Sequence, residues 1–192
     1  MDTKTIVIIA VVLVVVALAV IILLMERSRK SRRLKEHFGP EYDQLLREQG
    51  DPRRAEAVLA DREKRVEKFS ITQLSAADRQ RYAAEWANVQ KRFVDDPAMA
   101  VNEADRLVTA VMTSRGYPMA AFEQRAADIS VSYPRVVENY RSARLIASRH
   151  AKGQASTEEL RQALVHYRSL FDELLESTKS EKTGVSHGRL AS

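Results

Sequence analysis

Cysteine is absent from all 192 residues of the chain. Disulfide bonds, catalysis by a thiolate, and zinc or iron–sulfur sites built on cysteine are therefore excluded. The absence does not choose between compartments, because a cytosolic domain needs no cysteine and a secreted domain can lack it.

Glycine is scarce, with six residues, and most of them stand where a helix should end. The sequence has no G-x-G-x-x-G, no P-loop and no G-x-S-x-G pattern, so nothing is shaped to cradle a phosphate or to present a nucleophilic serine. We therefore predict no cofactor and no catalytic residue, and we expect that the chain is not an enzyme.

Metal-binding patterns are also missing. None of the four histidines belongs to an H-E-x-x-H motif, and none has a glutamate three residues away as in di-iron bundles. Asp95 and Asp96 are adjacent carboxylates, but Asp96 is placed to cap a helix that starts at Pro97. We predict no metal site.

The longest apolar run, residues 6–25, reads IVIIAVVLVVVALAVIILLM and contains no polar side chain. As an α-helix it would span about 30 Å, which is the thickness of the hydrocarbon core of a bilayer. We predict a transmembrane helix here, which makes the lipid bilayer the first predicted partner.

Positive charge follows this run. One basic residue, Lys4, precedes the run, and six follow it closely: Arg27, Arg29, Lys30, Arg32, Arg33 and Lys35. Because Lys and Arg near a span stay in the cytoplasm, residues 1–5 should lie outside and the C-terminal part inside. We predict a single-pass protein of the plasma (inner) membrane; the alternative is a domain exported behind an uncleaved signal anchor.

A cleaved signal peptide is the competing interpretation of the run. It would carry its positive charge in front, would be shorter, and would end at a small-x-small cleavage site. Here the charge follows the run, and residues 24–27 (LMER) offer no such site. We therefore expect the run to be retained.

The six basic residues also account for the basic character of the chain. Of 31 Lys and Arg residues, these six leave 25 against 26 Asp and Glu. A near-neutral remainder argues against a nucleic-acid-binding domain. The basic segment at 26–36 is predicted to contact the membrane surface, where each charge adds roughly 1 kcal/mol, or else only to set the topology.

The rest of the chain is patterned for helices. No stretch alternates apolar and polar residues as a strand does. Gly39-Pro40 should interrupt a helix, Asp51-Pro52 should start one that reaches about Phe69, and Pro118 should open a short one. Ser75 with Asp78 and Ser156 with Glu159 resemble capping boxes. We predict an all-α fold, with a compact bundle of about five to seven amphipathic helices at 37–176 and a disordered tail at 177–192.

One aromatic stripe is distinctive. Tyr82, Trp86, Val89 and Phe93 recur at helical spacing, and such a stripe is usually core. We expect Trp86 to be buried against the face that runs from Leu164 to Phe171. The alternative makes Tyr82, Trp86 and Phe93 an interaction face.

The order of several segments resembles a family of uncharacterised bacterial single-pass membrane proteins. The segments that carry the resemblance are 37–43 (HFGPEYD), 53–56 (RRAE), 62–66 (REKRV), Trp86 with 93–97 (FVDDP), 104–108 (ADRLV), 122–128 (FEQRAAD) and 167–175 (YRSLFDELL). The resemblance implies an N-terminal anchor followed by a helical domain, and it implies no activity or cofactor.

Two functions are consistent with these features. The first is a membrane-tethered helical adaptor on the cytoplasmic face, which binds an unknown protein partner. The second is a lipid- or small-ligand-binding helical module near the bilayer, which a large apolar cavity between the helices of Trp86 and Phe171 would favour.

Overall fold

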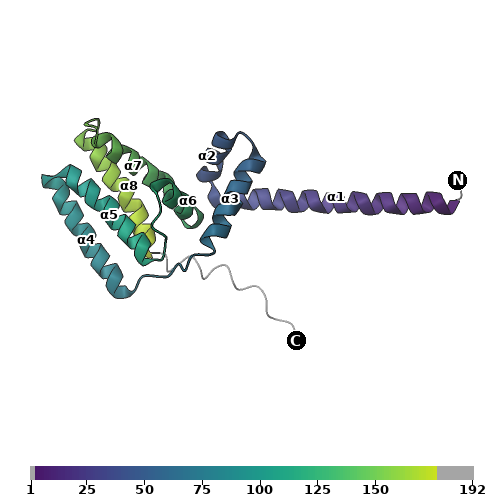
Figure 1. The fold of residues 1–192 in the computed structure, drawn as a ribbon, viewed down its shortest axis with the longest axis horizontal. Helices are drawn as coiled ribbons and strands as arrows, with labels where there is room; N and C mark the ends of the chain where they lie inside the picture. Colours follow the sequence, from purple (N-terminus) through teal and green to yellow (C-terminus); the bar gives the residue numbers. More distant parts are fainter. Residues whose placement is uncertain (1–2, 177–192) are drawn as a thin grey trace. The chain divides into compact units, whose positions relative to one another are not determined.

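The computed structural model describes the backbone of residues 3–176, and within it the side chains of all residues except 3–11 and 14. The described backbone forms eight α-helices and no strand, which confirms the all-α prediction (Figure 1). The predicted disordered tail at 177–192 and the first two residues of the chain lie outside the described residues. The predicted transmembrane helix at 6–25 lies partly outside the residues whose side chains are described.

Seven of the eight helices follow the first one, in agreement with the predicted five to seven. The helices are α1 (Thr3–Phe38), α2 (Pro40–Gln49), α3 (Pro52–Val66), α4 (Ala76–Asp95), α5 (Pro97–Ser114), α6 (Phe122–Ser132), α7 (Val137–His150) and α8 (Thr157–Glu176).

Contacts divide the chain into two units, residues 1–59 and residues 60–192. The first unit contains α1, α2 and the beginning of α3, and the second contains the end of α3 and α4–α8. Residues 37–59 of the predicted helical domain at 37–176 belong to the first unit, together with α1.

In the first unit, α1 runs without a break through the apolar run and the basic segment. It ends at Phe38, and Gly39 turns the chain with a φ of 48° before Pro40 begins α2. The predicted interruption at Gly39-Pro40 is therefore confirmed. Apolar side chains from all three helices of this unit are buried: Leu34, Phe38, Tyr42, Leu45, Ala55 and Leu59.

In the second unit, four long helices build the core. α4 packs on α5, α5 on α8, and α8 on α7, while α6 adds to α7. Because each helix is amphipathic, its apolar stripe faces the others and its charged side faces water. The largest fully buried side chains of this core are Trp86, Met112, Ile129, Tyr140, Tyr167, Leu170, Phe171 and Leu174.

Side-chain caps begin three of these helices as the sequence predicts. Asp96 Oδ1 accepts from the backbone N–H of Met99 at 2.9 Å, directly before Pro97. Ser156 and Glu159 form a reciprocal capping box, in which each side chain accepts from the backbone N–H of the other, at 3.2 and 2.8 Å. At Ser75 the hydroxyl accepts from the backbone N–H of Asp78 at 3.0 Å.

Two predicted boundaries are wrong. α3 ends at Val66 rather than at Phe69, because the Phe69 N–H bonds to the carbonyl three residues back, at 2.9 Å, and tightens the turn. α6 begins at Phe122 rather than at Pro118, since residues 117–121 run as an irregular segment.

The segment after α3 is fixed to the end of α5. Thr72 donates its backbone N–H to the Arg115 carbonyl at 2.8 Å. The next residue, Gly116, has a φ of 92°, and a Cβ atom there would stand 2.3 Å from the Ser70 carbonyl oxygen. Two separate features therefore require glycine at this position: the positive φ, and the close approach of the segment that contains Ser70.

Candidate functional site

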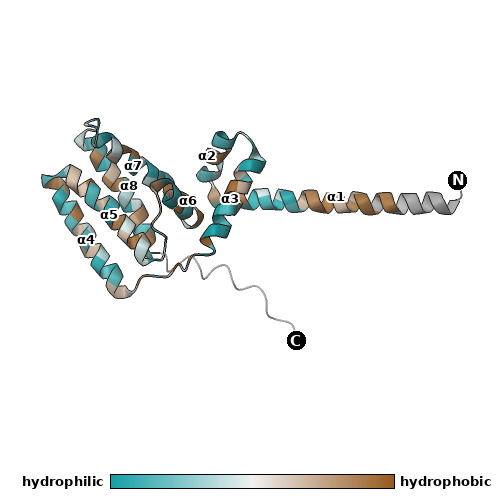
Figure 2. Cartoon of the chain, viewed as in Figure 1, coloured by the Kyte–Doolittle hydropathy of each residue, from teal (hydrophilic) through white to brown (hydrophobic). Residues whose placement is uncertain are grey.

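The described part of the apolar run on α1 is exposed. The large apolar side chains that are described between Val12 and Met25 have about half of their surface or more uncovered, as in Leu23 at 64%. Val20 to Met25 are consecutive and cover more than one helical turn, so this part of α1 is apolar on every side. Figure 2 shows it as a brown stretch followed by teal.

Such a surface is unusual for a helix that packs on one side of a protein core, which needs only one apolar stripe. Removing one Val, Leu or Ile side chain from water is favourable by about 1.5–3 kcal/mol of free energy. The described part of the run therefore lacks cover on all sides within the first unit, since α2 and the beginning of α3 leave its side chains exposed.

Among the residues that the structure describes, no helix has both the length and the apolar character needed to cross a membrane.

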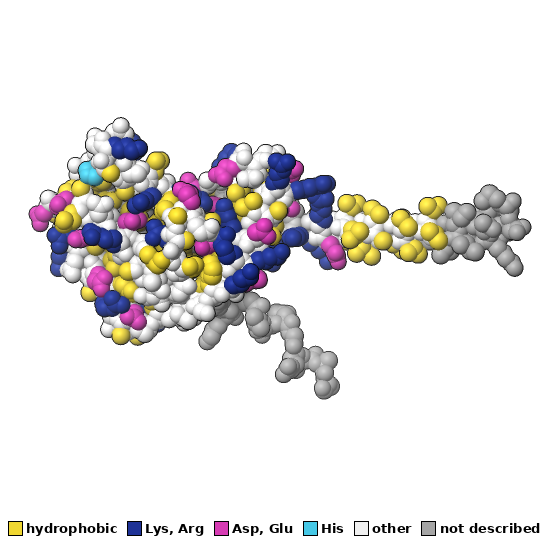
Figure 3. Space-filling view, in the orientation of Figure 1, with side chains coloured by type: hydrophobic (Ala, Val, Ile, Leu, Met, Phe, Trp, Pro, Cys, Tyr) yellow, Lys and Arg dark blue, Asp and Glu magenta, His cyan; other side chains and the backbone are white. Residues whose placement is uncertain are grey.

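The basic segment continues on the same helix. All six predicted membrane-surface residues have exposed side chains: Arg27, Arg29, Lys30, Arg32, Arg33 and Lys35. Dark blue side chains follow the yellow apolar ones along α1 in Figure 3. Arg32 pairs with Glu36 one turn later, with 2.7 Å between Nε and Oε1, and both are exposed, so this pair adds little to stability. The positive charge of the segment is therefore exposed directly beside the end of the apolar run.

One carboxylate, on α3, accepts hydrogen bonds from both α1 and α2. Glu56 Oε1 accepts from the Ser31 hydroxyl at 2.6 Å and from the Tyr42 hydroxyl at 3.2 Å, so it joins all three helices. Burial raises the pKa of Tyr42 above its ordinary value, and the hydrogen bond to Glu56 acts in the same direction. Sequence reasoning does not single out Glu56, because the three partners are far apart along the chain.

A cleft lies next to this contact. It has a volume of about 280 Å³ and is bordered by two helices of the first unit. Its lining residues are Leu24, Arg27, Ser28 and Ser31 of α1, and Pro52, Arg53 and Glu56 of α3. The cleft begins where the apolar run ends and where the basic segment starts.

The aromatic stripe of α4 lies in the core of the second unit. Trp86 is 1% exposed and stacks on Phe171 of α8, with 4.6 Å between the ring centroids and 27° between the ring planes. The predicted packing of Trp86 against the face from Leu164 to Phe171 is confirmed. Arg168 lies over the Trp86 ring, with its guanidinium carbon 5.4 Å from the centroid.

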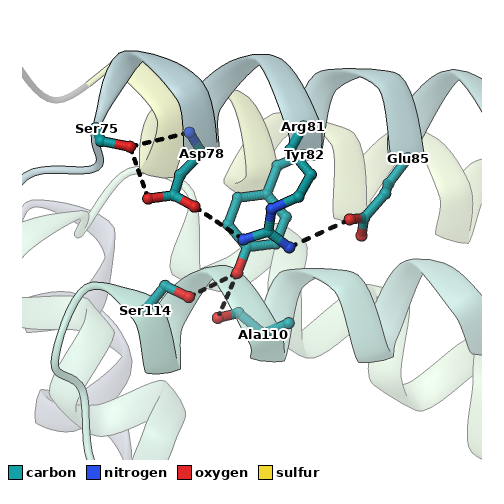
Figure 4. Close-up of polar contacts among 7 residues, drawn as sticks. All are labelled: Ser75, Asp78, Arg81, Tyr82, Glu85, Ala110 and Ser114. Atoms are coloured by element: carbon teal, nitrogen blue, oxygen red, sulfur yellow. Dashed lines mark hydrogen bonds and ion pairs between the residues drawn. The ribbon is translucent and has the colours of Figure 1, made fainter.

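Tyr82 is hydrogen-bonded to α5. Figure 4 shows its hydroxyl between Ser114 Oγ, at 2.6 Å, and the Ala110 carbonyl, at 3.4 Å. Arg81 covers the ring from outside and pairs with Asp78 and with Glu85, both exposed partners on α4.

Two of the three residues of the alternative interaction face at Tyr82, Trp86 and Phe93 therefore lie in the core of the second unit. Tyr82 and Trp86 are buried against α5 and α8, and only Phe93 is half-buried. Large aromatic side chains at helical spacing lose most surface by facing the core, and the bundle uses them in that way.

Two buried ionic groups of the second unit were missed by sequence reasoning. Arg115 is buried and donates to the Leu174 carbonyl at 3.1 Å, to the Thr72 carbonyl at 3.3 Å, and to the Tyr133 hydroxyl. Asp128, also buried, pairs with Arg65 and accepts from Gln124 at 2.9 Å. These contacts tie α3, α5, α6 and α8 together and have no pattern along the sequence.

A third polar group lies between α5, α7 and α8. Asp105 accepts from the Tyr167 hydroxyl at 3.0 Å and from Arg144 at 3.3 Å. Burial, reinforced by the charge of Asp105, raises the pKa of Tyr167. Burial also raises the pKa of Tyr140 to about 12. Both tyrosines are therefore neutral structural side chains.

The described residues contain no group of three His, Asp or Glu side chains that could hold a metal ion. Comparisons of the chain with protein-family models, with curated proteins and with solved structures find no match. The resemblance to bacterial single-pass membrane proteins therefore stays a prediction.

Proposed function

We propose that the chain is a membrane-tethered helical adaptor: α1 inserts its apolar run into a bilayer, and the helical bundle binds a protein partner. The observation that carries the proposal is the exposure, on every side of α1, of the apolar side chains that are described between Val12 and Met25. A bilayer interior covers such a helix on all sides, and its backbone groups are already satisfied within the helix.

The charges beside the run support the same arrangement. The basic segment starts directly after Met25, and its six Lys and Arg side chains are exposed. In a membrane it would lie at the headgroups, with residues 1–5 outside and the bundle on the cytoplasmic face of the plasma (inner) membrane.

The adaptor role of the bundle rests on how its interior is used. Its aromatic side chains pack in or against the core, and the buried Arg115 and Asp128 form hydrogen bonds and an ion pair within the bundle. The alternative, a ligand-binding module, called for a cavity between the helices of Trp86 and Phe171. These two rings stack at 4.6 Å, which leaves no space for a ligand between them.

Site-specific photocrosslinking in membranes tests the adaptor. A photoreactive residue replaces Val94, which is 83% exposed, or Leu145, which is 62% exposed. The buried Val108 is the matched control. The adaptor predicts a discrete crosslinked protein band at one or both exposed positions and none at Val108. If no exposed position of the bundle gives a discrete band, the bundle is not an adaptor.

A further inference from the structure

The cleft between α1 and α3 combines three features at one place. Leu24 is the second-last residue of the apolar run, and Arg27 follows three residues later, which is about 4.5 Å along the helix axis. Arg53 faces the same cleft from the first turn of α3. If the apolar run lies in a bilayer, the cleft lies at the level of the lipid phosphates.

The two arginines are available for an anion. Within the part of the chain that the structure describes, neither the Arg27 nor the Arg53 guanidinium forms a hydrogen bond or ion pair. Glu56, the one carboxylate of the lining, is engaged by the hydroxyls of Ser31 and Tyr42 instead. Two unpaired guanidinium groups at one cleft suit a phosphate, because Arg binds phosphate oxygens with two parallel hydrogen bonds.

We propose that this cleft is a binding site for the headgroup of an anionic glycerophospholipid, with its phosphate between Arg27 and Arg53. The proposal rests on the proposed function, since it needs α1 in a membrane. The volume of about 280 Å³ is close to the lower limit of small-molecule pockets, roughly 300 Å³, so the cleft holds a headgroup and not the acyl chains. The acyl chains lie along the apolar run beyond Leu24.

The chemistry of the lining also selects among headgroups. Ser28 supplies a hydroxyl, and the Glu56 carboxylate has further acceptor capacity beyond its two hydroxyl partners. A headgroup with hydroxyl donors beyond its phosphodiester satisfies Glu56, whereas a bare phosphate meets the carboxylate as a like charge. The site therefore prefers a polyol headgroup, for which phosphatidylglycerol is the probe.

The test uses the full chain in mild detergent and native mass spectrometry. Phosphatidylglycerol, phosphatidylcholine and inorganic phosphate are titrated in separate arms. We expect one phosphatidylglycerol to bind about tenfold more tightly than phosphatidylcholine, as expected when charge-assisted hydrogen bonds distinguish the two lipids by about 1.4 kcal/mol. Inorganic phosphate should bind much more weakly than the lipid.

The matched variants separate the cleft from general charge attraction. The Arg27→Gln, Arg53→Gln double variant should lose this preference. The Arg29→Gln, Arg54→Gln variant removes the same charge from the same two helices, outside the cleft, and should keep it. Equal losses in both variants, equal binding of the two lipids, or binding of inorganic phosphate as tight as that of phosphatidylglycerol would each overturn the headgroup site.

Flotation with vesicles of phosphatidylcholine and phosphatidylglycerol tests membrane insertion of α1 separately from headgroup binding in the cleft. Wild type and both double variants retain the apolar run, so all three should float with the vesicles. If the wild type does not float, the tether fails and the headgroup site fails with it. If all three float but show the same lipid binding, only the headgroup site is overturned.

Discussion

Trp86 of α4 and Phe171 of α8 stack in the core of the second unit, with 4.6 Å between their ring centroids. α5 lies against both helices, through the contacts of α4 with α5 and of α5 with α8. The stacked pair therefore joins two helices that are distant along the chain, and the stability of the second unit should depend on it.

Trp86→Ala should lower the free energy of unfolding by roughly 3–5 kcal/mol, because it leaves a cavity where a large aromatic side chain was buried. Urea unfolding of the full chain in mild detergent, followed by circular dichroism, measures the change. Val94→Ala is the control, since Val94 is 83% exposed and its truncation should have almost no effect. A Trp86→Ala protein as stable as the control would mean that the indole is not a core group.

Gly116→Ala and Gly153→Ala form a matched pair. Both glycines have positive φ, 92° and 71°, so both substitutions add backbone strain of about 1 kcal/mol. At Gly153 a Cβ meets nothing within 4 Å, whereas at Gly116 it would stand 2.3 Å from the Ser70 carbonyl oxygen. We expect Gly116→Ala to be clearly more destabilising in the same unfolding measurement. Equal losses would show that the connector after α3 does not approach Gly116 this closely.

The capping box at Ser156 and Glu159 should make stability depend on pH. The backbone and side-chain hydrogen bonds from Ser156 lower the pKa of Glu159 below its ordinary value of 4.5. A lowered pKa means that the ionised carboxylate stabilises the fold above pH 4.5, and that this stabilisation disappears as the pH falls through the lowered pKa.

Glu159→Gln keeps the size of the side chain and one acceptor but removes the charge. The variant should be less stable than the wild type at pH 7, and the difference should shrink towards zero on acidification below pH 4. Thermal unfolding at a series of pH values measures it. A difference that stays constant from pH 7 to pH 3 would rule out a contribution from the charge.

Orientation has its own test, since six basic residues follow the apolar run and Lys4 alone precedes it. A phosphatase that is active only outside the cytoplasm, fused after Ser192, should be inactive in cells. A reporter that works only inside the cytoplasm should be active at the same position and controls for expression. Strong phosphatase activity from an intact fusion would reverse the orientation.

The sequence predicted the helices better than their tertiary links. Asp96 before Pro97 and Ser156 before Glu159 are local patterns, so the starts of α5 and α8 could be predicted. The core position of Trp86 is also predictable, because helical spacing indicates which side chains share a face. The sequence does not predict the end of α3 at Val66, because the tight turn up to Phe69 continues the chain without continuing the helix.

In the candidate site, too, some features are visible along the sequence and others appear only in the fold. The apolar run and the basic segment are visible as composition along the chain. The cleft is not visible in this way, because Arg27 and Arg53 are 26 positions apart in the sequence. They line the same cleft only after the chain turns at Gly39 and Gly50, which have positive φ. Glu56 is likewise one of many acids on a charged helix, and only the fold gives it Ser31 and Tyr42 as partners.

Extraction of the full chain from membranes at alkaline pH tests the tether most directly. Alkaline carbonate strips proteins that are held by charge, such as by the basic segment, and leaves those inserted in the hydrocarbon core. Leu18→Arg with Ile22→Arg places two charges on the exposed apolar surface, at a cost of roughly 2.5–3.5 kcal/mol each near the membrane centre. Val94→Arg with Leu145→Arg adds the same charge to the bundle as a control. The wild type and the control should stay in the membrane pellet, and the α1 variant should be released; release of the wild type into the soluble fraction would contradict insertion of α1.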